Sequence, residues 1–270
     1  MARPSSETRP LYDRVTDAII ADLDRGIRPW MKPWNAGPLA GSVSRPLRHA
    51  GEPYRGINIL LLWAEAAACG YTTSTWMTFR QALELGGHVR KGEHGATVVY
   101  ANRVEQIDGL PERFLEPPPK LTPDQRIDLA ETFFAKTGAV IRHGGAEAYF
   151  AFGSDHVQMP PFECFDDPEA YYATLAHECV HWTGHPRRLD RDLARLSAGC
   201  DGYAQEELVA ELGSAFLCAD LGLSLEPRDD HAPYIAVWLD MLGHDRRAIF
   251  AAAAKAQQAC DFLHARGSST

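Results

Sequence analysis

The chain has 270 residues, of which 45% are hydrophobic and 23% charged, and its formal net charge is −9. No apolar run is long enough for a transmembrane helix, and the polar N-terminus lacks the hydrophobic region of a secretory signal, so we expect a cytoplasmic protein with no membrane contact. Residues 1–100 carry 12 Lys and Arg against 9 Asp and Glu, whereas the remainder carries 15 against 27. This balance argues against a protein that binds polyanions over its whole surface, but a basic first part remains compatible with nucleic-acid contact.

Residues 1–105 are expected to form a small N-terminal α+β domain. The segment RPWMKPWNAG, from Arg28 to Gly37, contains Pro29 and Pro33 and therefore favours extended chain. Glycines bound residues 87–101, which predicts a hairpin with a strand at 96–101. Apolar periodicity followed by glycine predicts three helices, at 10–25, 56–69 and 78–85.

Residues 106–270 are expected to form a second domain, entered through a proline-rich linker at about 111–121. Thr122, Pro123 and Gln125 suit the N-cap, first position and capping-box partner of a helix that ends near residue 136. Further elements are predicted in chain order: strands at 139–141, 148–151 and 156–159, a helix that starts at about 168, and helices at 204–221 and 233–263.

The six cysteines contain no Cys-x-x-Cys pair. In a cytoplasmic chain of this size, free buried thiols are favoured over disulfides or a cysteine–metal cluster. The cysteines are Cys69, Cys164, Cys179, Cys200, Cys218 and Cys260.

An HExxH motif lies in the second domain, at His177, Glu178 and His181. On a helix the two histidines are one turn apart on the same face, which suits two imidazoles that converge on one Zn²⁺ ion. Glu178 borders that face, where a carboxylate can take a proton from metal-bound water. The motif therefore predicts a catalytic metal site on this helix.

The third ligand is less directly indicated. Arg187 occupies the position where metzincins have a third histidine, and arginine cannot bind a metal. His185 has a suitable spacing, but it also suits a histidine that caps the helix C-terminus. We favour Glu207 as the ligand, with Glu211 one turn later as the carboxylate that orients a ligating histidine. Glu206 fits a solvated acidic face instead.

Cations and aromatic residues alternate between residues 25 and 58, with Glu52 as the one acid among six Lys and Arg. Cations that follow phosphates beside rings that stack on bases are typical of single-strand binding, although the tryptophans could equally be core residues and the charges a solvated loop. The candidate DNA-binding residues, two of them on the predicted hairpin tip, are Arg28, Trp30, Lys32, Trp34, Arg45, Arg48, Tyr54, Arg55, Arg90 and Lys91.

The runs YYATLAHECVHWTGHPRRLDR and YAQEELVAELGSAFLCADLGL resemble the metallopeptidase-like domain of ArdC-type antirestriction proteins, and WMTFRQALELGGHVRKGEHGATVVY resembles their first domain. That first domain is shared with TraC-type plasmid primases and is associated with single-stranded DNA. The resemblance implies a zincin-like second domain with His177, His181 and Glu207 as metal ligands and Glu178 as catalytic base. The run VVYANRVEQIDGLP is shorter than the family pattern, which puts the last strands of the first domain in doubt.

Together these features predict an antirestriction protein of a plasmid or other mobile element, active during conjugation, that binds single-stranded DNA and carries a zinc-dependent peptidase site. Another divalent metal such as Mn²⁺ is an alternative, and a host protein is the expected peptidase substrate. The strand at 156–159 is a candidate edge strand for an extended substrate, and Tyr203 and His231 are candidates to stabilise the oxyanion. The rival hypothesis is a non-catalytic DNA-binding protein that protects by occlusion, with a structural or vestigial metal site, for which Glu178 would be dispensable.

Overall fold

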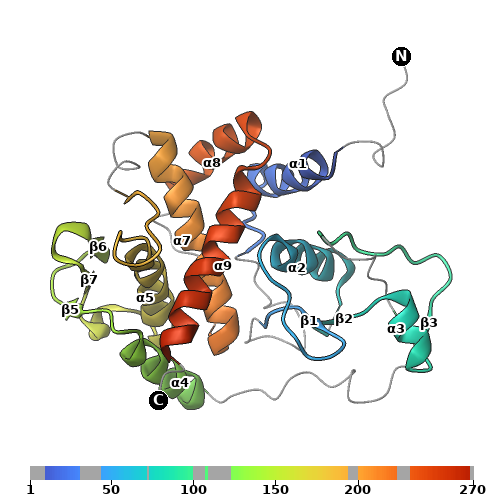
Figure 1. Ribbon diagram of the computed structural model, residues 1–270, viewed down its shortest axis with the longest axis horizontal. Coiled ribbons are helices and arrows are strands. Elements are labelled where there is room, and N and C mark those ends of the chain that lie inside the picture. Colours follow the sequence, from blue (N-terminus) through green and yellow to red (C-terminus); the bar gives the residue numbers. More distant parts are fainter. Residues whose placement is uncertain are drawn as a thin grey trace.

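The computed structural model describes residues 10–30, 44–71, 73–99, 107–108, 123–193, 200–223 and 232–267. The long helices α7 and α9 lie side by side at the centre of the molecule, and shorter elements surround them (Figure 1). The helices are α1 (Leu11–Asp24), α2 (Ile57–Cys69), α3 (Phe79–Glu84), α4 (Pro123–Thr137), α5 (Pro168–Thr183), α7 (Cys200–Leu221), α8 (Ala232–His244) and α9 (Ala248–Gly267). The strands are β1 (Leu47–Arg48), β2 (Thr75–Trp76), β3 (His88–Val89), β4 (Ile107–Asp108), β5 (Ile141–His143), β6 (Tyr149–Ala151) and β7 (His156–Met159). This mixture confirms the predicted α+β class.

The first part of the chain contains three helices where the sequence predicts them. Gly70 closes α2 in the left-handed conformation, with φ of +69°, which glycine adopts without steric cost. Thr78 caps α3 through a reciprocal pair of hydrogen bonds with Gln81. Strand β1 pairs in parallel with β2, and β3 pairs antiparallel with β4.

The predicted strand at 96–101 is wrong for residues 97–99, which form none of the strands, and Ala96 forms only a single β-bridge. The backbone of Val99 bonds to a side chain of α2 instead: its N–H donates to Asn58 Oδ1 at 2.6 Å and its carbonyl accepts from Asn58 Nδ2 at 3.1 Å. Because these backbone groups are already paired, they are not available to a hairpin ladder. The partner of β3 is β4, which comes later in the chain.

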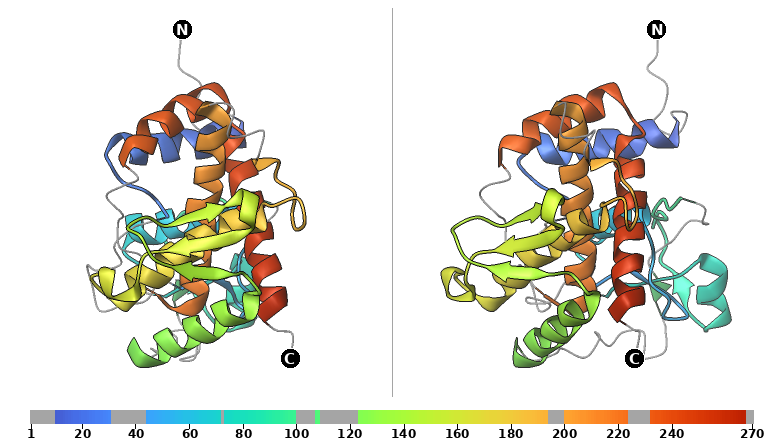
Figure 2. Two further views of the ribbon diagram at one scale, coloured as in Figure 1. Left: turned by 90° about the vertical axis from the view of Figure 1, so that its left-hand side faces the viewer. Right: turned by 60° about the vertical axis from the view of Figure 1, so that its left-hand side comes forward.

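A small sheet with the order β5-β7-β6 packs against α5 in the second part of the chain (Figure 2). Strand β7 pairs in parallel with β5 and antiparallel with β6. The prediction that residues 156–159 form an edge strand is therefore wrong, because both sides of this strand are occupied. Among the described strands of this sheet, β5 and β6 have the free edges.

The helix expected at 233–263 is broken into α8 and α9 around Asp245. The Asp245 side chain accepts a hydrogen bond from Arg247 N at 2.8 Å, and its carbonyl accepts from Ala248 N. An aspartate that bonds the backbone two residues later forms a turn and starts the next helix, which explains the break. No described helix is long and apolar enough to span a membrane.

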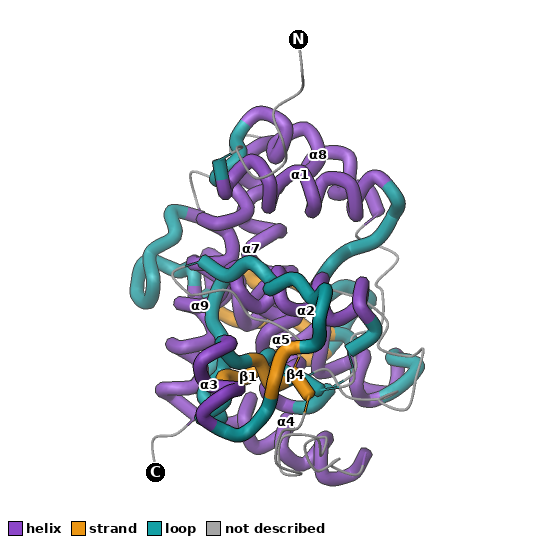
Figure 3. The backbone as a smooth tube through the Cα atoms, turned by 90° about the vertical axis from the view of Figure 1, so that its right-hand side faces the viewer, coloured by secondary structure: helices purple, strands orange, loops and turns teal. Residues whose placement is uncertain are grey.

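The buried core does not divide between the two predicted domains. Helix α1 packs against α8 (Figure 3), and α2 packs against α9. Buried side chains of α1 and α2, together with Trp30, belong to the same apolar cluster as those of α5, α7 and α9. A second, smaller cluster lies around Tyr54 and Trp76. The predicted boundary at residue 105 and the linker at 111–121 lie outside the described residues, so the division of the chain stays a prediction.

The prediction of free, buried thiols is confirmed for three of the cysteines. Cys179, Cys218 and Cys260 are free and buried, and burial raises the pKa of each thiol. Cys69 and Cys164 are also free, as predicted, but the prediction that they are buried is wrong, since both are exposed. The side chain of Cys200 lies outside the described residues.

One ion pair connects the sheet to the end of α5. Arg188 donates to both carboxylate oxygens of Asp155, donates through Nε to the carbonyl of Trp182, and lies 3.9 Å from the Trp182 ring centre. Asp155 has a φ of 51°, a conformation that asparagine also tolerates. The hydrogen bonds from Arg188 hold the pKa of Asp155 below its usual value of 3.8.

We therefore expect Asp155→Asn to lower the free energy of unfolding at pH 7 by about 1 kcal/mol, a value reduced for the partial exposure of the pair. Because the folded-state pKa is depressed, the contribution is present above the unfolded pKa and is lost as the pH falls through the folded pKa. Urea unfolding of both proteins at pH 7 and at pH values below 3.8 measures the difference. A difference that stays constant over this range would mean that the carboxylate charge is not its origin.

Candidate metal centre

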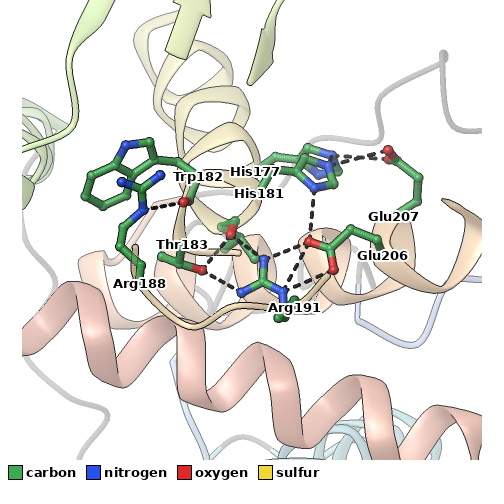
Figure 4. A network of polar contacts seen from close by, with 9 residues as sticks. His177, His181, Trp182, Thr183, Arg188, Arg191, Glu206 and Glu207 are labelled. Atoms are coloured by element: carbon green, nitrogen blue, oxygen red, sulfur yellow. Dashed lines mark hydrogen bonds and ion pairs between the residues drawn. The ribbon is translucent and has the colours of Figure 1, made fainter. Parts of the chain in front are cut away.

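Three side chains from two helices converge on one point. His177 and His181 project from α5, and Glu207 projects from α7 (Figure 4). The two Nε2 atoms of the histidines lie 3.2 Å apart, and each lies 3.4 Å from an oxygen of Glu207. Donor atoms in a tetrahedral zinc site with bonds of about 2.0–2.1 Å are about 3.3 Å apart. The histidine at each end faces a different oxygen of Glu207, Oε2 for His177 and Oε1 for His181, so these spacings are compatible with a divalent ion held by the three residues.

The close packing of α5 on α7 brings these donors together. A Cβ atom built on Gly213 of α7 would lie 2.7 Å from Cγ2 and 3.0 Å from Cγ1 of Val180, which precedes His181. Glycine at this position therefore lets the two helices approach closely. Asp167 caps the start of α5 by accepting from Ala170 N at 2.8 Å, and Pro168 occupies the first turn.

The positions of the candidate third ligands favour Glu207 over His185. Glu207 is 7% exposed and faces both histidines. His185 instead packs against Phe152, with ring centres 5.1 Å apart, and its Nδ1 accepts from Arg187 N. Within the described part of the chain, His177, His181 and Glu207 are the group with metal-binding geometry.

The carboxylate that lies beside His181 is Glu206, and the role of Glu211 in orienting a ligating histidine stays a prediction. Glu206 Oε1 lies 3.3 Å from His181 Nδ1, whereas Glu211 accepts a hydrogen bond from Trp30 Nε1 at 3.2 Å. The expectation that Glu206 is solvated is also wrong, since it is 5% exposed. Helix α7 is buried on all sides from residue 206 to 219, so its acidic residues do not share an exposed face.

Electrostatics of the site favour a cation. Burial raises the pKa of Glu207, but hydrogen bonds to His177 and His181 outweigh it and lower that pKa overall. Burial alone would lower the pKa of His181, but its bonds to Glu206 and Glu207 raise it to about 10. The cluster thus attracts positive charge, as a site for a divalent ion requires.

Glu178 is 5% exposed and follows the ligand His177 directly in α5. Its role as catalytic base stays a prediction. Tyr203 lies one turn before Glu207 on α7, is 47% exposed, and has its hydroxyl 3.5 Å from that of Tyr234. Burial raises the pKa of Tyr203, as do Tyr234 and Glu207, so a protonated phenol stands beside the ligand carboxylate. This position suits its predicted part in oxyanion stabilisation, whereas His231 lies outside the described residues.

Three of the candidate DNA-binding residues are buried, and for them the prediction is wrong. Trp30 is 1% exposed and packs edge-on against Trp238. Arg45 is 6% exposed and pairs with Asp220 and Gln257, and Tyr54 is also 6% exposed. Each of these side chains completes the core or an internal ion pair and offers no face to a base or phosphate.

The other candidates remain predictions. Arg28 is partly buried, and Lys32 and Trp34 lie outside the described residues. Four cations are exposed: Arg48, Arg55, Arg90 and Lys91. Arg48 lies 5.2 Å from the Tyr54 ring centre, and Arg55 forms an exposed ion pair with Asp261 of α9.

Comparison with known proteins gives two family matches. Residues 9–140 match the N-terminal domain of anti-restriction factor ArdC, and residues 128–255 match a zincin-like metallopeptidase family. An uncharacterized protein of Sinorhizobium fredii, y4eC, is 44% identical over 96% of this chain and 92% of its own length. DNA primase TraC of Escherichia coli is 35% identical over 94% of this chain, which corresponds to 27% of the primase.

Two solved structures are similar over nearly their whole length. The metal-free crystal structure of the antirestriction ArdC protein from plasmid R388 has a TM-score of 0.82 and 42% identity, covering 96% of this chain and 98% of that one. The Mn(II)-bound structure of the same protein has a TM-score of 0.80 and 41% identity, covering 97% and 99%.

Proposed function

The chain belongs to the ArdC family of antirestriction proteins, and we propose that it protects the DNA of a mobile element by combining a metal-dependent peptidase site with a surface for single-stranded DNA. The observation that carries the proposal is the triangle of donor atoms from His177, His181 and Glu207, with the buried Glu178 next to His177 in the sequence of α5. A site that served only to stabilise the fold would not need this glutamate.

The donor set of two imidazoles and one carboxylate suits zinc, and this is the ion we propose. Divalent affinities of such sites rise from manganese to zinc, and the relative from plasmid R388 has a Mn(II)-bound structure. The metal content of the purified protein, with competition between the two ions, identifies the ion that this chain prefers.

The bound ion would lower the pKa of a water molecule and polarise a carbonyl group. The protein side chains perform the remaining steps. Glu178 accepts the proton from the water and later delivers it to the nitrogen of the departing amine. Tyr203, one turn before Glu207 on α7 and partly exposed, would donate a hydrogen bond to the carbonyl oxygen as it gains negative charge. An extended peptide of a host protein could align along the free edge of β6 or β5.

A basic surface for single-stranded DNA is proposed for the first part of the chain. Arg48, Arg55, Arg90 and Lys91 are exposed there, and Lys32 and Trp34 belong to the same basic and aromatic stretch of sequence. Exposed cations contact phosphates, so binding should weaken steeply as salt is added. The buried Trp30, Arg45 and Tyr54 take no part in this surface.

The substitution Glu178→Ala tests the peptidase proposal. It removes the base but keeps the three ligands, so we expect any hydrolytic rate to fall on the order of 10²–10⁴-fold while metal content is unchanged. The measurement is the survival of unmodified plasmid DNA that enters a restricting host expressing either protein. Metal content and single-strand binding are measured on both proteins, and Glu84→Gln, on the exposed face of α3, is the matched control.

Loss of protection with metal and DNA binding intact would support hydrolysis as the basis of protection. Equal protection by Glu178→Ala would contradict the peptidase proposal. Occlusion of single-stranded DNA by the exposed cations would then be the better explanation, with a metal site that is structural or vestigial.

A further inference from the structure

We propose that Glu206 and Arg191 are positioning residues of the metal site: their buried ion pair fixes the ring orientation and tautomer of His181, so that Nε2 faces the metal. The inference rests on the metal-binding part of the proposed function. It concerns affinity for the ion and does not require that hydrolysis occurs.

The first support is that the two ring nitrogens of His181 have different partners. Nε2 lies in the donor triangle, 3.2 Å from His177 Nε2 and 3.4 Å from Glu207 Oε1. Nδ1 lies on the opposite side of the ring, 3.3 Å from Glu206 Oε1 (Figure 4). A neutral imidazole carries its proton on one nitrogen and a lone pair on the other. A proton on Nδ1 that is donated to Glu206 therefore leaves the lone pair of Nε2 directed at the metal position.

The second support is that Arg191 holds Glu206 in place. Arg191 Nη2 donates to Glu206 Oε1 at 2.7 Å and Nε donates to Oε2 at 3.1 Å, so the guanidinium grips both carboxylate oxygens. The two side chains are 4% and 6% exposed. A two-point contact of this kind restricts rotation of the carboxylate as well as balancing its charge.

The same guanidinium also forms hydrogen bonds to α5, the helix that carries His177 and His181. Nη1 donates to Thr183 Oγ1 at 2.7 Å, and Nη2 donates to the carbonyl of Val180 at 2.6 Å. Val180 and Thr183 flank His181 on α5, whereas Glu206 neighbours the ligand Glu207 on α7. Arg191 thus connects both ligand-bearing helices at the positions next to their ligands.

The backbone conformation of the loop around Arg191 positions its side chain beside the metal site. Asp190 and Asp192, the residues on either side, have φ values of 48° and 56°, a conformation that is uncommon for residues other than glycine. The Arg191 N–H donates to the carbonyl of Gly184, and a Cβ on Gly184 would lie 2.9 Å from Arg191 Nη2. The loop therefore contains two unusual backbone conformations, and the Arg191 side chain packs closely on Gly184. Both features help to bury the arginine beside the metal site.

The experiment measures metal affinity by competition between a chromophoric chelator and the purified full-length protein, with zinc and then manganese as the probe. Glu206→Ala is expected to weaken binding about 10–100-fold. Glu206→Gln should recover most of the affinity, because its amide oxygen can still accept from His181 Nδ1. Nitrogen and proton NMR of the zinc-loaded proteins reports the Nδ1–H of His181 directly, and the hydrogen-bonded Nδ1–H signal should be lost in Glu206→Ala.

Glu206→Ala leaves a buried unpaired arginine and could fail to fold. The double variant Glu206→Leu with Arg191→Met removes both charges together, which buried ion pairs often tolerate. We expect it to fold and still to bind metal about 10–100-fold more weakly, because His181 has lost its acceptor.

Arg188→Ala is the matched control. Arg188 lies in the same loop and also anchors the end of α5, but it contacts Trp182 and Asp155 and none of the ligands. We expect it to lower the unfolding temperature while metal affinity stays within about twofold of wild type.

Two results would overturn the inference: wild-type affinity in the double variant, or an equal loss of affinity in Arg188→Ala, which would point to general destabilisation. Failure of the wild-type protein to bind any divalent metal would overturn the proposed function as well. If Glu178→Ala protected DNA as well as wild type while wild-type metal affinity was normal, the peptidase proposal would fail and this inference would be unaffected.

Discussion

Replacing Glu207 with glutamine is expected to weaken divalent-metal binding by about a hundredfold or more. Apparent zinc-binding free energies of about 10–16 kcal/mol in four-ligand sites imply about 3 kcal/mol for each ligand, and each 1.4 kcal/mol is tenfold in affinity. Glutamine keeps the shape of the side chain but removes the negative charge that attracts the metal ion. The loss should therefore reflect coordination, with the packing of α7 unchanged.

The measurement is chelator competition, together with the rise in unfolding temperature on addition of metal. Ligands that bind the native state stabilise it, so wild type should gain stability with zinc and Glu207→Gln should gain far less at the same concentration. Glu84→Gln removes an equal charge from exposed α3 and should behave as wild type. Wild-type affinity in Glu207→Gln would mean that the third ligand lies elsewhere, among residues that the donor triangle does not include.

The second large effect is expected from Gly213→Ala, which should lower the free energy of unfolding by about 1–3 kcal/mol and weaken metal binding as well. The added methyl group would lie 2.7 Å from Val180 Cγ2, so α5 and α7 must move apart. Val180 precedes His181, and separating the helices therefore moves the histidines away from Glu207. Alanine favours a helix over glycine by about 0.8–1.0 kcal/mol, so a net loss of stability must come from packing.

A second substitution tests this explanation. Val180→Ala removes both methyl groups that the new Cβ would meet, so adding it to Gly213→Ala should restore part of the stability and most of the metal affinity. Urea unfolding and chelator competition are measured on both single variants and on the double variant. Purely additive effects would show that the contact between Gly213 and Val180 is not what positions the helices.

The order of elements and the nature of the metal site follow from local sequence. Glycine ends α2, and Thr78 with Gln81 starts α3, because capping depends on residues within one turn of the helix end. His177 and His181 lie on one face of α5 because a spacing of four residues guarantees it on any helix. The third ligand, Glu207, could also be proposed from sequence, since it belongs to the resemblance.

The errors concern contacts between segments that are distant in the chain. The expectation that Glu206 is solvated fails because α7 is buried on all sides from residue 206 to 219, where Glu206 lies beside His181 and Glu211 bonds to Trp30. Arg191, which pairs with Glu206, lies in a loop where sequence offered no signal. The edge-strand prediction for β7 failed for a related reason, because the order of strands in a sheet depends on long-range pairing.

The sequence by itself therefore determined the chemistry of the site, the family resemblance and most helix boundaries, because these depend on residue types and spacings over a few turns. Tertiary structure alone decided which carboxylate lies beside His181 and which aromatic and basic residues are exposed. Trp30 and Arg45 illustrate the reason: an aromatic–basic stretch looks the same in sequence whether it faces DNA or the core. Their burial depends on Glu211 and Asp220, which lie more than 170 residues further along the chain.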